Sequence, residues 1–231
     1  HIRFGTSVNG ARFDEASGLW HLDTSNGPIT ARALITATGQ LNRPAWPNLP
    51  GRDRFAGETF HSACWDHDVD LTGKTVAVIG TGASAIQFVP EIAKQAKQVL
   101  LFQRSAPYVI PKPDRPYSAT EQRLMARFPL LQKLDRARVY AQNEARVLGF
   151  TSLQGAMRFH EYLFKKHLNA CVPDPDTRAK LTPDYPMGCK RILISNDYYQ
   201  ALTKYRIPVI TGGVRAITAD GVEDTDGEHH Q

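Results

Sequence analysis

The sequence predicts an α/β protein in which a parallel sheet carries a helix between two of its strands. The prediction depends on residues 74–105, where two short apolar runs, 76–79 and 99–102, are long enough for strands buried on both faces. Between these runs the spacing of apolar residues predicts a helix over 85–96. Its apolar positions are Ile86, Val89, Ile92, Ala93 and Ala96.

The turn that joins the first strand to this helix is typical of a nucleotide-binding loop, because residues 80–85 fit G-x-G-x-x-G/A. Gly80 permits the tight turn, Gly82 lets a pyrophosphate approach the backbone, and Ala85 is small enough for close packing of helix on strand. The positive end of the helix dipole then faces the phosphates. We predict a dinucleotide site, and the alternative is a tight turn without a ligand. The predicted contacts are Gly80, Thr81, Gly82, Ala83, Ser84, Ala85 and Gln87.

The residues after the second strand indicate which nucleotide is bound. NAD sites place an acidic residue there for the ribose hydroxyls, whereas this chain has Gln103-Arg104-Ser105. An acid would repel a 2′-phosphate, and a guanidinium pairs with it in a bidentate, charge-assisted way. The sequence therefore predicts NADPH, and the alternative is a solvated arginine at the end of a strand.

The segment before this unit is strand-like. Turn signals separate the apolar runs 11–13, 19–22 and 29–34, which predicts an antiparallel meander. A further strand is predicted over 33–37, ending at Thr38 and Gly39. Residues 42–54 are too rich in proline for a central strand or a helix and are interpreted as a linker between domains.

The segment after this unit alternates between loops and helices. Four prolines predict a loop over 107–116, and Ser118 with Glu121 forms a capping-box pattern at the start of a helical stretch that is interrupted near Pro129. The remaining expected elements are a helix over 152–171, a proline-punctuated segment over 173–186, a helix capped by Ser195 and running to 205, a strand over 207–211, and a hairpin made by 214–218 and the residues after 221.

Composition excludes several classes of protein. With 42% hydrophobic and 22% charged residues, the 231-residue chain can bury one substantial core or two small ones. The net charge of +5 is spread along the sequence, so nothing indicates nucleic-acid binding. No apolar run approaches the roughly 20 residues that span a bilayer, and we expect no signal peptide. Three cysteines without C-x-x-C spacing predict reduced thiols in a cytoplasmic protein, with neither a disulfide framework nor a metal site.

Residues 55–66 carry a more specific pattern. They read FAGETFHSACWD and match F-x-G-x-x-x-H-x-x-x-W-[P/D] at every fixed position. The segment resembles the fingerprint of Baeyer–Villiger flavin monooxygenases and lies directly before the nucleotide-binding strand. Taken individually, His61 and Trp65 are a linker histidine and a packed aromatic. In the family context the resemblance implies that His61 links flavin chemistry to domain motion, since it lies on the hinge.

Three further segments are similar to the same family. Ala37-Thr38-Gly39 resembles the strand end at which the chain passes from the FAD domain into the NADPH domain, which implies that Thr38 and Gly39 contact a cofactor. Gln103-Arg104-Ser105 resembles a Q-R-[ST] segment in which the arginine and the hydroxyl bind the 2′-phosphate.

Gly188-Cys189-Lys190-Arg191 resembles the G-x-K-R segment of the family. The resemblance implies that Lys190 contacts the 2′-phosphate, and that Arg191 reaches the flavin and the nicotinamide and stabilises an anionic flavin peroxide. A guanidinium suits this role because it does not lose its proton. Without the resemblance, Lys190 and Arg191 are an exposed basic pair.

The resemblance also implies an architecture. A Rossmann-like NADPH-binding domain is expected over 46–215, with a helical insertion at about 117–185, inside a partial FAD-binding domain formed by 1–45 and 216–231. Complete members begin with their own FAD-binding G-x-G-x-x-G and end with a long C-terminal part. Because neither is present, we expect the chain to be an internal piece of a longer protein and inactive alone.

The activity that the resemblance implies is that of a monooxygenase dependent on NADPH and FAD. Its partners are O₂ and a small ketone, which yields an ester or lactone, or a sulfide; the oligomeric state stays open. Three alternatives remain: a related flavin monooxygenase that acts on nitrogen or sulfur, a flavin disulfide reductase, and a non-catalytic NADP-binding module. The disulfide reductase needs a redox cysteine pair, and Cys64, Cys171 and Cys189 provide no close pair.

Overall fold

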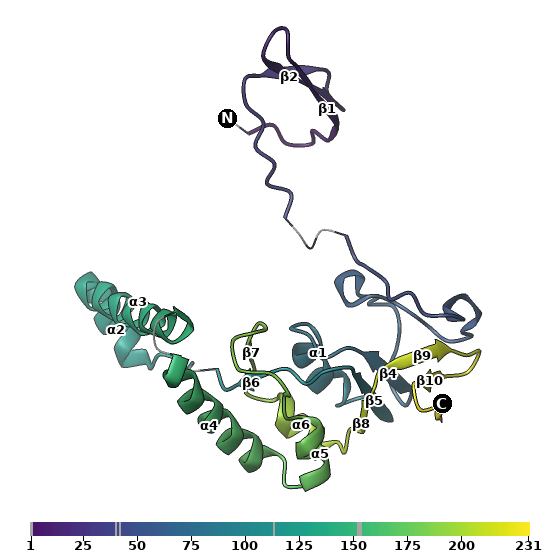
Figure 1. Cartoon of the computed structure of the whole chain (residues 1–231). Coiled ribbons are helices and arrows are strands. Elements are labelled where there is room, and N and C mark those ends of the chain that lie inside the picture. Colours follow the sequence, from purple (N-terminus) through teal and green to yellow (C-terminus); the bar gives the residue numbers. More distant parts are fainter. Residues whose placement is uncertain (1, 40, 42, 113, 152–153) are drawn as a thin grey trace. The chain divides into compact units, whose positions relative to one another are not determined.

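The computed structural model describes residues 2–39, 41, 43–112, 114–151 and 154–231. The chain divides into two compact units, His1–Ala45 and Trp46–Gln231 (Figure 1). Parts of three predicted segments lie outside the described residues: Asn42 of the linker, Pro113 of the loop, and the first two residues of the helix expected over 152–171.

The first unit is the antiparallel meander that the sequence predicts. β1 (Val8–Asp14), β2 (Leu19–Thr24) and β3 (Ile29–Ala31) pair in the order β1-β2-β3. Phe13 and Trp20 lie opposite each other on β1 and β2, with ring centroids 5.3 Å apart. Aromatic pairs of this kind stabilise a sheet across its strands.

The further strand predicted over 33–37 is not formed. Residues 33–39 have no regular secondary structure, and the Ile35 side chain is 88% exposed. A strand needs a neighbour for its backbone hydrogen bonds, and no strand of the described residues pairs with this segment. The prediction that a strand ends at Thr38 and Gly39 is therefore wrong for this structure.

The second unit is built on a parallel sheet. β4 (Thr75–Ile79), β5 (Gln98–Gln103) and β8 (Val209–Thr211) lie in the order β4-β5-β8. The crossover from β4 to β5 contains α1 (Ala85–Ile92), which confirms the predicted strand-helix-strand unit. The helix ends four residues sooner than expected. Hydrogen-bonded turns follow it, and the Lys97 amide already donates to Lys74 O at 2.9 Å, beside the start of the β4–β5 ladder.

The sheet is covered on both faces, as alternate residues of β5 show. Val99 and Leu101 belong to the main core, which includes residues of α1 and of α6 (Tyr198–Lys204). Leu100 and Phe102 belong to a smaller cluster with Val222. Val222 lies on β10 (Val222–Asp224), which pairs with β9 (Val214–Ile217) and β11 (His229–His230) in a small antiparallel sheet. Successive side chains of a strand point to opposite faces, so β5 is buried from both sides.

A helical segment separates β5 from β8 in the sequence. It comprises α2 (Ala119–Arg127), α3 (Pro129–Thr151), α4 (Gln154–Cys171) and α5 (Pro175–Lys180). The break predicted near Pro129 is confirmed, because Pro129 starts α3. Phe164 of α4 joins the main core and contacts the Tyr108 ring at a centroid distance of 4.8 Å. Within the described residues, no helix has the length and apolar character needed to cross a bilayer.

Two local predictions require correction. The loop predicted over 107–116 contains β6 (Val109–Ile110), which pairs in parallel with β7 (Leu193–Ile194). The two proline-flanked residues can join this ladder because the amides of Leu193 and Ser195 supply the donors, to Tyr108 O and Ile110 O. The helix predicted from Ser195 starts at Tyr198 with Asp197 as its N-cap residue, and the Ser195 hydroxyl accepts from the Tyr198 amide at 3.2 Å.

The capping box predicted at the start of α2 is present and yields a pH-dependent prediction. Glu121 forms an ion pair with Arg115 at 2.6 Å and accepts from the Ser118 amide at 2.8 Å. These contacts, the Arg115 hydrogen bond first, lower the pKa of the Glu121 carboxyl from 4.5 to about 2. Because the folded pKa lies below the ordinary one, the stabilisation is complete above pH 4.5 and is lost as the pH falls towards about 2.

In an NMR titration of the side-chain carboxyl, we expect Glu121 to show a midpoint at about pH 2. Arg115→Ala should move this midpoint upwards towards the ordinary glutamate range, because the ionised carboxylate loses its main partner. Arg123→Ala on the same helix is the control and should leave it unchanged. A midpoint that does not respond to Arg115→Ala would show that the ion pair is not the cause.

Candidate functional site

The carboxyl ends of the three parallel strands lie at one edge of the sheet. β4 is followed by the glycine loop that starts at Gly80, β5 is followed by Arg104 and Ser105, and β8 is followed by Gly212 and Gly213. Ligands of open α/β sheets bind at this edge, outside the carboxyl ends of the strands. Register brings the three loops together, since Phe102 pairs with both Ile79 and Ile210.

These loops surround a cavity of about 610 Å³. Its wall combines the glycine loop, the loop after β5, the end of β8 and the segment before β7. The lining residues are Pro47, Leu49, Ile79, Gly80, Thr81, Gly82, Ala83, Phe102, Arg104, Ser105, Pro107, Tyr185, Lys190, Arg191, Leu193, Gly212, Gly213 and Val214. Eight of the residues predicted to bind a cofactor or to act in catalysis thus lie around one cavity: Gly80, Thr81, Gly82, Ala83, Arg104, Ser105, Lys190 and Arg191.

The glycine loop has the backbone that the motif requires. Gly80 adopts φ +108°, a conformation that side chains with a Cβ rarely adopt, and its amide donates to Phe102 O at 2.9 Å. Thr81 Oγ1 lies 3.4 Å from Ser105 O, which ties the glycine loop to the loop after β5. A Cβ added to Gly82 would meet no protein atom within 4 Å. Packing within the described chain therefore does not demand a glycine at position 82, whereas a ligand that approached the backbone would.

The charge of the cavity is positive. Arg104, Lys190 and Arg191 line it and are exposed, and none of the described residues that line it is an aspartate or a glutamate. Lys190 Nζ lies 3.2 Å from Ser105 Oγ, so the lysine and the hydroxyl predicted to bind the same phosphate are adjacent. Among the described residues, no carboxylate forms an ion pair with any of the three cations. Such a wall attracts an anion with several charges.

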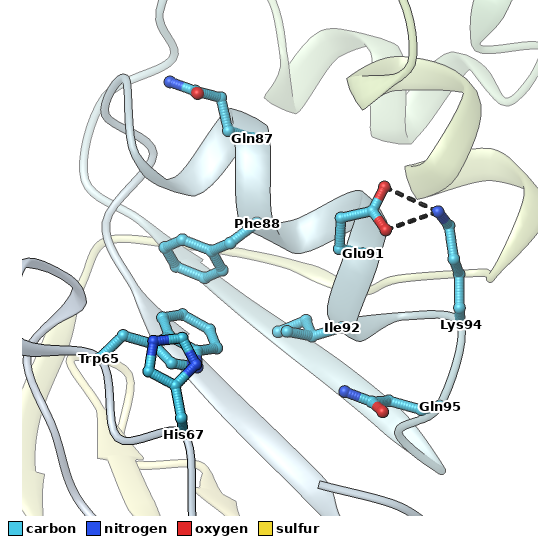
Figure 2. Close-up of a pocket in the computed structure, with 8 residues that line it drawn as sticks. All are labelled: Trp65, His67, Gln87, Phe88, Glu91, Ile92, Lys94 and Gln95. Atoms are coloured by element: carbon cyan, nitrogen blue, oxygen red, sulfur yellow. Dashed lines mark hydrogen bonds and ion pairs between the residues drawn. The ribbon is translucent and has the colours of Figure 1, made fainter.

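Other predicted residues lie outside this cavity. Ala85 is buried at the start of α1, and Ser84 makes no capping hydrogen bond with its side chain. The Gln87 amide donates to Ala83 O at 2.8 Å. Gln87 is among the residues that line a second, open hollow of about 560 Å³, which Trp65 and Phe88 also line (Figure 2). Thr38 and Gly39 lie in the first unit, where Gly39 adopts φ +73°.

The fingerprint segment has a structural explanation at several of its fixed positions. A Cβ at Gly57 would lie 2.7 Å from the Phe55 ring, so the glycine leaves room for that ring. The Nδ1 atom of His61 accepts from the Ala63 amide at 3.0 Å and caps a short 3₁₀ turn. Trp65 packs on Phe88 of α1, with ring centroids 5.2 Å apart. Thus His61 does not line the cavity that contains Arg191, and its catalytic role stays a prediction.

Sequence reasoning missed Tyr185 and the glycines Gly212 and Gly213. The glycine pair could have been noticed, because it directly follows the strand predicted over 207–211. Both glycines have positive φ angles, +98° and +103°. Tyr185 offers no signal in the sequence, since a single tyrosine in a proline-rich segment is typical of a loop.

Comparison with known proteins identifies the family. Residues 1–150 match the family described as pyridine nucleotide-disulphide oxidoreductase. The chain belongs to this family. Pyridine nucleotide-disulphide oxidoreductases are named for a disulfide, but Cys64, Cys171 and Cys189 are all free in this member. No two of them are close in the sequence, so the disulfide reductase alternative gains no support from a cysteine pair.

Individual relatives are monooxygenases. A Baeyer-Villiger monooxygenase from Pseudomonas aeruginosa is 48% identical over 227 residues, which are 98% of this chain and 43% of that protein. The structure of an oxidized steroid monooxygenase bound to NADP has a TM-score of 0.79 at 30% identity, and that of OTEMO in complex with FAD and NADP has 0.79 at 28%. Each match covers 100% of this chain and 51% of the solved chain. Within its family, the chain is thus similar to Baeyer–Villiger monooxygenases. It spans about half the length of the relatives that it matches.

The open space above Gly82 allows a test of the loop. Gly82→Ala should leave the stability of the chain almost unchanged, because the new methyl group meets no protein atom. It should weaken binding of NADP⁺ and NAD⁺ alike, by roughly tenfold or about 1.4 kcal/mol, since both carry the same pyrophosphate. Calorimetric titration measures this loss.

Gly155→Ala is the matched control, because Gly155 is exposed on α4 and a Cβ there also meets nothing within 4 Å. It should leave both affinities unchanged. Unaltered binding of both nucleotides by the Gly82→Ala chain would contradict the prediction that the pyrophosphate lies against this loop.

Proposed function

We propose that the chain binds NADPH in the cavity at the carboxyl edge of β4, β5 and β8. The observation that carries the proposal is the trio of cations, Arg104, Lys190 and Arg191, around a cavity with no acid among the described residues of its lining. An NAD site places an acid after the second strand, whereas a 2′-phosphate needs cations there. The NADP-bound structures of related monooxygenases support the same assignment.

The residues present fit the two charged parts of this nucleotide. The loop from Gly80 to Ala83 offers backbone amides and open space to the pyrophosphate at the N-terminus of α1. Arg104, Ser105 and Lys190 offer a guanidinium, a hydroxyl and an ammonium to the 2′-phosphate. The two sets lie on neighbouring loops that Thr81 and Ser105 join.

We further propose that the chain is the NADPH-binding portion of an FAD-dependent monooxygenase. The relatives and the fingerprint at 55–66 support this. In the net reaction NADPH and a proton are consumed with O₂, one oxygen atom enters a ketone or a sulfide, and the other leaves as water. In this proposal residues 1–45 belong to an FAD-binding domain and 46–215 form the inserted NADPH-binding domain. Residues 216–231 begin the return, starting within β9.

FAD, when bound, supplies the oxygen chemistry, and the protein supplies position and charge. Arg191 contributes a permanent positive charge at the cavity wall, because a guanidinium keeps its proton at every physiological pH. A fixed cation stabilises developing negative charge without giving up a proton. Thr38 and Gly39 of the first unit are the proposed contacts of this chain with FAD.

The first test concerns the choice of nucleotide. Arg104→Ala should weaken NADP⁺ binding by about 2 kcal/mol, roughly 30-fold, because a charge-assisted hydrogen bond to the 2′-phosphate is lost. NAD⁺ binding should stay almost unchanged, since NAD⁺ lacks this phosphate. Isothermal titration calorimetry with each nucleotide measures both affinities.

Arg138→Ala serves as the control, because Arg138 forms an ion pair with Asp135 of α3 and does not line the cavity. It should change neither affinity. Equal losses of NADP⁺ and NAD⁺ binding in Arg104→Ala would contradict the assignment of Arg104 to the 2′-phosphate.

The second test concerns Arg191 in the full-length protein that carries both cofactors, because the chain is expected to be inactive alone. Arg191→Ala should lower the rate of product formation by roughly 10²- to 10³-fold, as expected for loss of one preorganised charged group. The loss of NADP⁺ affinity should be far smaller. The rate of product formation, with a ketone and with a sulfide, is the measurement.

A normal rate of product formation by the Arg191→Ala protein would contradict the catalytic role of Arg191. NADPH binding without any flavin-dependent oxygen uptake by the full-length protein would instead favour a non-catalytic nucleotide-binding module.

A further inference from the structure

We propose that Tyr185 is a positioning residue that holds the Lys190 ammonium at the 2′-phosphate end of the cavity and so sets the preference for NADPH over NADH. The proposal rests on the proposed NADPH site. Lys190 Nζ lies over the Tyr185 ring, 4.2 Å from its centroid, and 3.2 Å from Ser105 Oγ. The lysine thus has an aromatic face on one side and the predicted phosphate-binding hydroxyl on another.

Two hydrogen bonds that run in opposite directions hold Tyr185, one through its side chain and one through its backbone. Its ring hydroxyl donates to Ala106 O at 3.0 Å, and its backbone carbonyl accepts from the Tyr108 hydroxyl at 2.8 Å. The two rings are nearly perpendicular, with centroids 5.5 Å apart and an interplanar angle of 89°. Burial raises the pKa of the Tyr185 phenol, so at neutral pH the hydroxyl keeps the proton that it donates.

This double link joins two segments that are far apart in the sequence. Ala106 and Tyr108 follow directly after Arg104 and Ser105, and Tyr108 is buried against Phe164 of the main core. On the other side, Tyr185 lies five residues before Lys190. The contacts between Tyr108 and Tyr185 therefore attach the segment that contains Lys190 to the main core.

The ring acts on Lys190 in a way that leaves the ammonium free to bind a phosphate. An aromatic face attracts a cation without a carboxylate that would compete with the ligand. The ammonium has three donors, so N–H groups remain for a phosphate besides the contact with Ser105 Oγ. A lysine has four rotatable side-chain bonds, and restricting them before binding lowers the entropy lost when the ligand arrives.

The test compares Tyr185→Leu, Tyr185→Phe and Lys190→Ala in the full chain, titrated with NADP⁺ and with NAD⁺ at one ionic strength. Tyr185→Leu removes the ring and should weaken NADP⁺ binding by roughly two- to fivefold, the range of an exposed cation–π contact. Tyr185→Phe keeps the ring but loses the hydroxyl. Its NADP⁺ affinity should lie between those of the Tyr185→Leu variant and the unmodified chain. NAD⁺ binding should change by less than about twofold in each, since NAD⁺ has no 2′-phosphate for Lys190 to bind.

A double-mutant cycle distinguishes positioning of Lys190 from general support of the fold. If Tyr185 acts through Lys190, Tyr185→Leu should cost no further NADP⁺ affinity once Lys190→Ala is present. Tyr205→Leu is the matched control, because Lys204 lies over the Tyr205 ring at 5.0 Å and neither residue lines the cavity. It should leave the NADP⁺ affinity unchanged.

Four outcomes would overturn the proposal. Additive losses in the cycle, or equal losses for both nucleotides in Tyr185→Leu, would show that Tyr185 only supports the fold. Loss of NADP⁺ affinity in Lys190→Ala but not in Tyr185→Leu would support the proposed NADPH site and show that Tyr185 has no part in it. No preference for NADP⁺ in the unmodified chain would overturn the NADPH site together with the role of Tyr185.

Discussion

The parallel pairing of β5 with both β4 and β8 is the constraint on which the site depends. Because all three strands run in one direction, the loops that follow them meet at the same edge of the sheet. β5 is buried on both faces, with Val99 and Leu101 in one cluster and Leu100 and Phe102 in the other. A shift of the β5 register by one residue would exchange these faces, so the hydrophobic core also fixes where Arg104 and Ser105 lie.

The electrostatics of the cavity depend on this framework. Arg104 and Lys190 come from segments more than eighty residues apart in the sequence, and the tyrosine pair Tyr108 and Tyr185 joins those segments. Cations gathered without a carboxylate repel one another, and an anion with several charges removes that repulsion. A nucleotide that binds only the folded state also stabilises it, by an amount that grows with its concentration relative to the dissociation constant. The proposed NADPH would supply the negative charge that the described lining of the cavity lacks.

The fingerprint segment shows how a sequence pattern can reflect structure as well as chemistry. Gly57 leaves room for the Phe55 ring, His61 caps a short turn, and Trp65 covers α1 through Phe88. These contacts shape the chain just ahead of β4, the strand that leads into the glycine loop. They explain why such residues are needed at these positions without placing His61 at the cavity wall.

The sequence by itself determined the strand-helix-strand unit, the glycine loop, the α2 capping box and the residue types that suit a 2′-phosphate, because each depends on neighbours within a few positions. Local patterns fail where partners are distant: residues 33–37 have strand-like composition but no pairing strand in the described structure, and Val109 and Ile110 form a strand only through Leu193 and Ile194. Tertiary structure alone decided that Lys190 meets Ser105 and that the Tyr185 ring lies beneath it. Such contacts depend on how the helical segment returns to the sheet, and this is set by packing of the whole core rather than by any single stretch of sequence.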